Sequence, residues 1–182
     1  MMWVKKRSGG TARGWYVYHT GNYDQGAGNG AAYGFNLLNT TDAYTDADYA
    51  WNETEPTDSS FTLGSIGTND NGNDYIAYLF ASLPGISKVG SYTGNGSSQT
   101  IDCGFTSGAR FILVKRTNST GDWYVWDTER GIVAGNDPYL ELNTTDAEVT
   151  GTDWVDPDNS GFIVNGTTIN ASGGDYIFYA IA

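Results

Sequence analysis

Two aspartates, Asp70 and Asp74, stand in the stretch GTNDNGND, among side-chain amides and glycines. Oxygen ligands on a turn of this kind are what a calcium ion prefers. A related stretch near the C-terminus, NGTTINASGGD, keeps only Asp175, and the closing glutamate of a full calcium loop is absent. Two interpretations therefore stay open: a cation site at Asp70 and Asp74, or an ordinary turn stabilised by Asn and Asp side chains.

The residues that a hydrolase would need are few. His19 is the only histidine, and the matching position later in the chain is Asp127, so we expect His19 to be a surface residue and not a member of a catalytic triad. Nothing in the sequence sets the distance between any two carboxylates of a glycosidase pair. The candidates for such a pair are Asp46, Asp48, Glu53 and Glu55. The sequence therefore predicts a protein that is not an enzyme and that needs no cofactor.

Aromatic side chains are abundant, with 6 Trp and 13 Tyr in 182 residues. In the run WYVW, side chains alternate between the two faces of a strand, so Tyr124 and Trp126 share one face. Trp51 and Trp154 each follow a copy of the run LNTTDA, in polar segments of the kind that carry binding surfaces. These four residues are the predicted contacts for a sugar ring or a protein surface. The alternative is that a partner sheet and a neighbouring module cover both faces.

The elements that position these residues occur twice. Several stretches recur in the same order about a hundred residues apart, which predicts two copies of one module. The matched pairs are VKKRS with LVKRT, WYVYHT with WYVWDT, LNTTDA with LNTTDA, SSFTLG with SGFIVN, and GNDYIAYLFA with GGDYIFYAIA. We place the modules at residues 1–85 and 86–182, divided near the run SLPGISK.

Both modules are predicted to be all-β. The apolar runs have the length of strands, are rich in aromatic and β-branched residues, and are bounded by turn residues. We therefore expect two tandem β-sandwiches, each with its strands between two layers. Tyr78 and Tyr179 lie in the longest apolar runs, and we expect both rings to be buried.

The second copy has a lead-in, residues 89–105, that the first copy lacks. Either the chain is the C-terminal piece of a longer protein, or another chain supplies the missing strand by pairing with an edge. The sheet of the first copy should then have an unpaired edge, and natural proteins seldom leave long edges open. We therefore expect a homo-oligomer whose interface lies at or near the strand that begins at Met1.

Composition excludes several classes of partner. The net charge of −12 and the isoelectric point near 4.1 argue against nucleic acid, because a phosphate backbone is bound by clustered Lys and Arg. No apolar stretch approaches the length of a membrane span, so we expect no membrane partner. The single cysteine, Cys103, is expected to be a small buried residue.

The order of the motifs in the second copy, YTGNG, FILVKR, GDWYVWDTERG, LELNTTDA, SGFIVN and ASGGDYIFYAIA, resembles a tandem repeat of tailed-bacteriophage structural proteins, especially marine and cyanobacterial phages. The resemblance covers residues 89–182 and 3–81. It implies a jelly-roll or concanavalin-like sandwich and a place on the virion, in a tail fibre or tail tip that attaches to the host surface. Phage fibres are commonly trimeric, so it also implies copies of the chain itself, other virion proteins and host surface glycans as partners. The alternatives are a capsid decoration or cement protein and a polysaccharide-degrading tail depolymerase.

Overall fold

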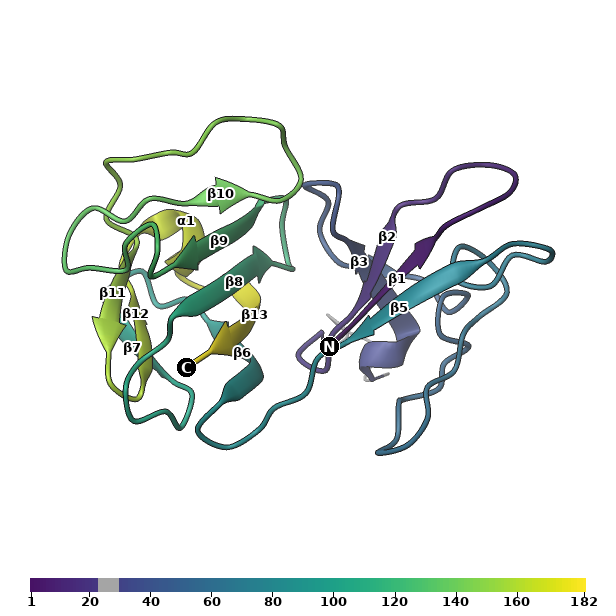
Figure 1. Cartoon of the computed structure of the whole chain (residues 1–182), viewed down its shortest axis with the longest axis horizontal. Helices are drawn as coiled ribbons and strands as arrows, with labels where there is room; N and C mark the ends of the chain where they lie inside the picture. Colours follow the sequence, from purple (N-terminus) through teal and green to yellow (C-terminus); the bar gives the residue numbers. More distant parts are fainter. Residues whose placement is uncertain (23–29) are drawn as a thin grey trace.

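The chain folds almost entirely into β-strands, which confirms the predicted all-β class (Figure 1). This computed structural model describes residues 1–22 and 30–182. Within them, helix is limited to a 3-10 turn, η1 (Ala31–Tyr33), and a single helical turn, α1 (Thr167–Asn170). None of the helices in this part of the chain is long and apolar enough to cross a membrane.

The strands form three antiparallel sheets. The first sheet has the order β4-β3-β2-β1-β5, made of β4 (Thr45–Asp46), β3 (Gly34–Leu37), β2 (Trp15–Tyr18), β1 (Met2–Lys6) and β5 (Tyr75–Leu79). The second has the order β10-β9-β8-β13-β6, made of β10 (Leu140–Glu141), β9 (Trp123–Asp127), β8 (Phe111–Arg116), β13 (Asp175–Ile181) and β6 (Ser87–Thr93). The third has the order β11-β12-β7, made of β11 (Val155–Asp158), β12 (Gly161–Val164) and β7 (Gln99–Asp102).

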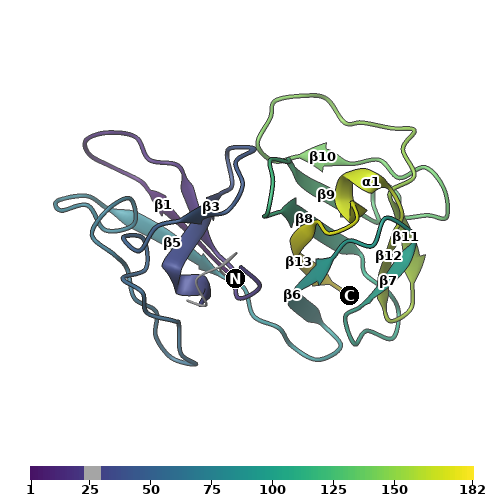
Figure 2. The same ribbon diagram turned by 180° about the vertical axis from the view of Figure 1, so that it is seen from behind.

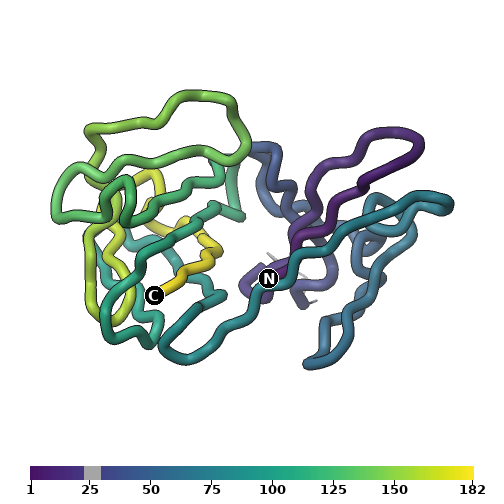
Figure 3. Tube along the Cα trace, viewed as in Figure 1, coloured from purple at the N-terminus to yellow at the C-terminus, as the bar shows by residue number. Residues whose placement is uncertain are grey.

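The sheets are stacked in layers that share apolar cores. The third sheet packs against one face of the second, and Phe162, Trp126 and Phe178 lie in the core between them. The other face of the second sheet packs against the first sheet, through Trp123, Ile177 and Val17 among others. The far face of the first sheet is covered by loops around Ala50 and Trp51 in place of a further sheet. Figures 1 and 2 show the first sheet beside the second, and Figure 3 follows the chain between them through residues 80–86.

The two halves repeat the same local hydrogen bonds. In the first half, the backbone N–H of Trp15 donates to the side-chain oxygen of Asn39 over 2.8 Å. In the second half, the N–H of Trp123 donates to Asn143 over the same 2.8 Å. Each Asn belongs to a copy of LNTTDA, so this run has one structural task in both halves: it caps the start of the strand that begins with Trp.

A second matched bond involves the final strand of each half. The hydroxyl of Tyr75 accepts the backbone N–H of Asp70 over 2.9 Å. The hydroxyl of Tyr176 accepts the N–H of Ala171 over 3.0 Å, again from five residues upstream. Each tyrosine therefore fixes the turn that precedes its own strand.

Strand pairing corrects one detail of the sequence alignment. Val4 lies opposite Tyr16 on β2, and Val114 lies opposite Tyr124 on β9. Val4 is therefore equivalent to Val114, one residue away from the alignment of VKKRS with LVKRT. The apolar and basic residues of this run follow one another so closely that the letters alone fit two registers.

The orders β3-β2-β1-β5 and β10-β9-β8-β13 are equivalent, and the second sheet continues with β6 where the first sheet stops. Within residues 1–22 and 30–182, β5 is therefore the edge of its sheet, as expected from the missing lead-in. Its neighbour β6 forms a seven-residue antiparallel ladder with β13.

One expectation about burial is wrong. Tyr78 was predicted to be buried, but its side chain is 43 % exposed. Its equivalent, Tyr179, is half-buried and packs in the core between the first and second sheets. Tyr78 lies on the edge strand, and no strand of the described residues covers it in the way that β6 covers β13.

Candidate functional site

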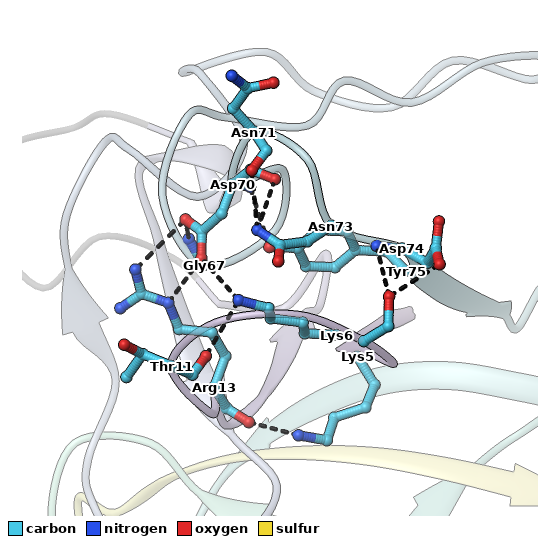
Figure 4. A network of polar contacts seen from close by, with 11 residues as sticks. Lys5, Lys6, Thr11, Arg13, Gly67, Asp70, Asn71, Asn73, Asp74 and Tyr75 are labelled. Atoms are coloured by element: carbon cyan, nitrogen blue, oxygen red, sulfur yellow. Dashed lines mark hydrogen bonds and ion pairs between the residues drawn. The ribbon is translucent and has the colours of Figure 1, made fainter.

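Asp70, a predicted cation ligand, is held by basic side chains (Figure 4). Its two oxygens accept hydrogen bonds from the Arg13 guanidinium, at 2.8 and 3.3 Å, and the Lys6 ammonium lies 3.8 Å away. The backbone N–H of Gly67 also donates to the carboxylate over 3.0 Å. The hydrogen bonds from Arg13 and Gly67 lower the pKa of Asp70 to about 2. Asp70 therefore neutralises cations of the protein itself.

Asp74, the other predicted cation ligand, lies beyond the turn and accepts a hydrogen bond from the Ser8 hydroxyl over 2.8 Å (Figure 4). Asn73 spans the turn by donating to the backbone oxygens of Asp70 and Asn71, at 3.1 and 3.0 Å. In the part of the chain that the structure describes, no group of three or more His, Cys, Asp or Glu residues is arranged to hold a metal ion. Of the two interpretations of this stretch, the turn is the one that the contacts support.

Trp51, a predicted ligand contact, is a core residue. Its side chain is 1 % exposed, and its ring meets that of Tyr18 edge to face at 6.0 Å. The indole N–H donates to the backbone oxygen of Gly34 over 2.9 Å. The loop that carries Trp51 packs on the far face of the first sheet, so Trp51 supplies apolar surface to the core there.

The other three predicted ligand contacts, Tyr124, Trp126 and Trp154, meet in one aromatic cluster with Tyr139. Trp154 stacks on Tyr139 at 4.8 Å with an interplanar angle of 17°, and its edge meets Tyr124 at 5.4 Å. Gly166 approaches Trp154 so closely that an added Cβ would stand 2.4 Å from the indole. Trp126 and Tyr124 are buried in the core between the second and third sheets. Trp154 is half-buried at the margin of this core, with one face of its ring against Tyr139.

His19 was expected at the surface and is fully buried between the halves, at 0 % exposure. Its Nδ1 accepts the N–H of Gly21 over 2.9 Å, so its Nε2 carries the proton and donates to the backbone oxygen of Phe178 over 3.0 Å. Burial lowers the pKa of the imidazole to about 3. His19 is therefore a neutral link between the first half and β13.

The acidic segment of the first half also has a structural task. Glu55 accepts a hydrogen bond from the Tyr18 hydroxyl and, through its other oxygen, one from the N–H of Ala32 over 2.8 Å. The side chains of Asp46 and Glu53 are exposed. Nothing in these contacts assembles a pair of carboxylates around a substrate.

Polar contacts between the halves gather on the LNTTDA loop of the first half. The Lys115 ammonium, on β8, donates to the backbone oxygens of Thr41 and Gly121, at 3.1 Å to Thr41. Lys115 is fully buried, and this burial lowers its pKa to about 8. The Trp123 indole N–H donates to the backbone oxygen of Leu37 over 2.9 Å. The same run therefore caps a strand in its own half and docks on the other half.

Sequence reasoning missed His19 and Lys115 as contacts between the halves. Both residues stand in repeated runs, WYVYHT and FILVKR, but letters within a run do not say which face another half covers. The one sequence signal was the difference between the runs WYVYHT and WYVWDT, where one copy has His19 and the other has Asp127.

Exposed apolar side chains gather where the first half joins the second. Leu79, Leu83 and Ile86 are 64 %, 52 % and 54 % exposed. Next to them lies a groove of about 570 Å³ whose walls include Met2, Tyr18, Phe61, Leu79 and Phe80. The outer edge of β5, which no strand of the described residues pairs with, lies at the same end of the first sheet.

Comparison with known proteins gives a family but no described relative. No curated protein and no solved structure matches the chain significantly. A family model described as "Domain of unknown function (DUF7483)" matches residues 1–182, the whole of the chain. The chain is a member of this domain family.

Proposed function

We propose that the chain is a non-enzymatic structural component of a phage virion, a tail fibre or tail-tip segment that takes part in attachment to the host surface. The proposal is supported by the intramolecular contacts of the charged, imidazole and aromatic side chains. Asp70, His19 and Lys115 are all satisfied by contacts within the chain, and the aromatic residues mostly form cores. A protein that works through its shape and surfaces has this distribution.

We also infer that residues 1–85 and 86–182 are two copies of one sandwich module. The matched bonds of Trp15 with Asn39 and of Trp123 with Asn143 support this division, as does the common order of four strands. The second copy has both of its sheets. The first copy has one sheet within the described residues, with loops in place of the second layer.

The function is tested by electron microscopy of the phage particles that carry this chain, labelled with antibody fragments raised against it. Label on the tail fibre or tail tip is the expected result. Label spread over the shell would favour a capsid decoration protein. Purified particles without label, in the presence of a labelled recombinant control, would refute a place on the virion.

Attachment and cleavage are separated by incubating the chain with polysaccharide from the host surface. Retention of the chain on immobilised polysaccharide without release of reducing ends is the result expected of an attachment module. Sustained release of reducing ends would show a depolymerase. A heat-denatured sample serves as the control for non-specific retention.

We further propose that the chain works as a homo-oligomer, a trimer, next to other virion proteins. The unpaired edge of β5 and the exposed apolar residues beside it support an assembly. Native mass measurement at several protein concentrations is the test, and a monomer at every concentration would contradict it.

A further inference from the structure

The hydrogen bonds between β1 and β5 show which backbone groups of β5 point to the outer edge of the sheet. Met1 and Phe80 exchange backbone hydrogen bonds, and the N–H of Arg7 donates to the oxygen of Asp74. Hydrogen-bonded pairs alternate along an antiparallel ladder. The backbone groups that point away from β1 are therefore those of Tyr75, Ala77 and Leu79.

Within residues 1–22 and 30–182, no strand pairs with these outward groups. The equivalent groups on β13 all have partners. There, the register places Tyr176 opposite Tyr92, Phe178 opposite Gly90, and Ala180 opposite Lys88, all on β6. The second half thus shows what covers the equivalent edge there: an antiparallel strand with the register of β6.

On both faces of the second sheet, side chains of β6 pack against side chains of β13. Tyr92 on β6 stacks on Tyr176 at 5.0 Å with an interplanar angle of 10°. Val89 lies opposite Tyr179 and packs in the core between the first and second sheets. The equivalents of these two tyrosines on β5 are only half-buried, at Tyr75, or 43 % exposed, at Tyr78. A strand beside β5 would bury apolar surface on both faces.

One difference between the edges makes them distinguishable. Gly90 of β6 lies opposite Phe178 of β13. A Cβ added to Gly90 would stand 2.5 Å from Cζ of Phe178, so this position of β6 requires glycine. On β5, the residue equivalent to Phe178 is Ala77, which is exposed. A strand beside β5 therefore tolerates a larger residue at its centre.

We propose that the outer edge of β5 is an acceptor for an extended, antiparallel segment with the residue pattern of β6, contributed by another polypeptide that carries the same repeat. The segment places an aromatic side chain over Tyr75 and an aliphatic one over Tyr78. Its far end lies beside Leu79 and the neighbouring groove. The inference deepens the proposed assembly and rests on it, because it names the site and the chemistry of the partner segment.

The test uses the whole chain and a synthetic peptide with the sequence of residues 86–96, ISKVGSYTGNG. Hydrogen exchange is followed at single amides by NMR. Adding the peptide at about 1 mM should slow exchange about tenfold or more at Tyr75, Ala77 and Leu79. Exchange at β8, at the centre of its sheet, is the internal reference and should not change.

Two changes identify the docking edge. A peptide with Gly90→Val should still protect β5, whereas it cannot replace β6 on β13. The chain variant Ala77→Pro removes an outward N–H without touching the ladder to β1, so it should abolish protection. Ala77→Thr keeps the N–H and serves as its matched control.

A charge exchange checks the register and does not depend on proline. Leu79 should lie opposite position 88 of the peptide, by analogy with Ala180 and Lys88. Leu79→Lys should therefore weaken protection by the natural peptide through like-charge repulsion, and a peptide with Lys88→Glu should restore it.

Three outcomes would overturn the inference. The first is unchanged exchange at these three amides with the natural peptide. The second is equal protection by a peptide of scrambled sequence. The third is protection that appears without peptide as the chain is concentrated, together with a doubled mass, because it would show that β5 pairs with β5 of a second copy. Native mass alone tests the assembly, so failure of the edge and failure of the assembly give different results.

Discussion

Strands β5 and β13 have nearly the same sequence and different surroundings. Both contain the pair YI followed two residues later by a second tyrosine, and both pair with an equivalent strand, β1 or β8. Most of β13 is buried, whereas the second half of β5 is exposed. The difference comes from one neighbour, because β6 covers β13 and no described strand covers β5. The sequence of a strand thus sets which side chains are able to pack, and the neighbouring strands decide how far those side chains are buried.

The largest test of this comparison removes one aromatic ring from each strand. Tyr176→Ala should lower the free energy of unfolding by roughly 3–5 kcal/mol, because the ring is 1 % exposed and stacks on Tyr92. Tyr75→Ala should cost about half of that or less, because no aromatic ring of the described residues stacks on Tyr75. Urea denaturation of the whole chain measures both.

Phenylalanine variants provide the control for this pair. Tyr75→Phe and Tyr176→Phe each remove a hydroxyl that accepts a backbone N–H from five residues upstream, and the hydroxyl of Tyr176 also donates to the backbone oxygen of Thr168 over 3.1 Å. Tyr75→Phe should cost about 1 kcal/mol, and Tyr176→Phe up to about 1 kcal/mol more for the second bond. Equal costs for the two alanine variants would contradict the role given to β6.

The next test concerns the position where the halves differ, His19 against Asp127. The unfolded chain takes up a proton on His19 near pH 6.5, and the folded chain only near pH 3, because burial disfavours the charged imidazole. The free energy of unfolding should therefore fall as the pH drops below about 6.5, by about 2 kcal/mol at about pH 5. In His19→Gln, which keeps a donor toward Phe178, this loss should be absent.

Asp137 acts in the opposite direction and has to be controlled. Its carboxyl is fully buried, and burial raises its pKa to about 6 from the ordinary value of 3.8. The folded chain therefore binds this proton first, and stability rises as the pH falls between about 6 and 4. Comparing His19→Gln and Asp137→Asn with the parent separates the two: the first variant should gain stability on acidification and the second should lose it. The same pH profile in all three proteins would refute both assignments.

A smaller effect is expected at the equivalent lysines Lys5 and Lys115. Lys115→Met removes an ammonium that bonds Thr41 across the interface and Gly121 within its own half, and it should cost about 1–2 kcal/mol. Lys5→Met removes a bond to Arg13 only and should cost less, because Lys5 is half-buried and its bond stays within one half. Thermal unfolding of both variants gives the comparison, and a larger loss at Lys5 would reverse it.

The smallest effect is expected from calcium. Because Arg13, Lys6 and Gly67 already surround the Asp70 carboxylate, millimolar CaCl₂ should leave the melting temperature of the chain unchanged relative to the same ionic strength of NaCl. Asp70→Asn should destabilise the first half, whereas Asp74→Asn, at an exposed site, serves as the matched control. A calcium-specific rise in melting temperature that Asp70→Asn abolishes would restore the cation site.

The sequence predicted much of the fold and little of the site. The all-β class and, within the described residues, the place of β5 at the edge of its sheet followed from strand-length apolar runs and the missing lead-in. The ligand contacts did not, because Trp51 and Trp126 read as loop or surface aromatics and are core residues in the structure. An aromatic strand has the same residue types whether solvent, a partner sheet or another module covers its face, so the sequence does not indicate which of these is present.

What the sequence determined by itself is local: the strands, the turns and the capping of each Trp strand by LNTTDA depend on neighbours along the chain or on one repeated partner. What only the tertiary structure decided is which surfaces are covered. The halves meet through one face of each sheet, so His19 and Lys115 became buried links and Tyr78 stayed at an edge. The physical reason is that burial depends on strands and loops distant in sequence, and here one strand, β6, is present beside β13 and has no described counterpart beside β5.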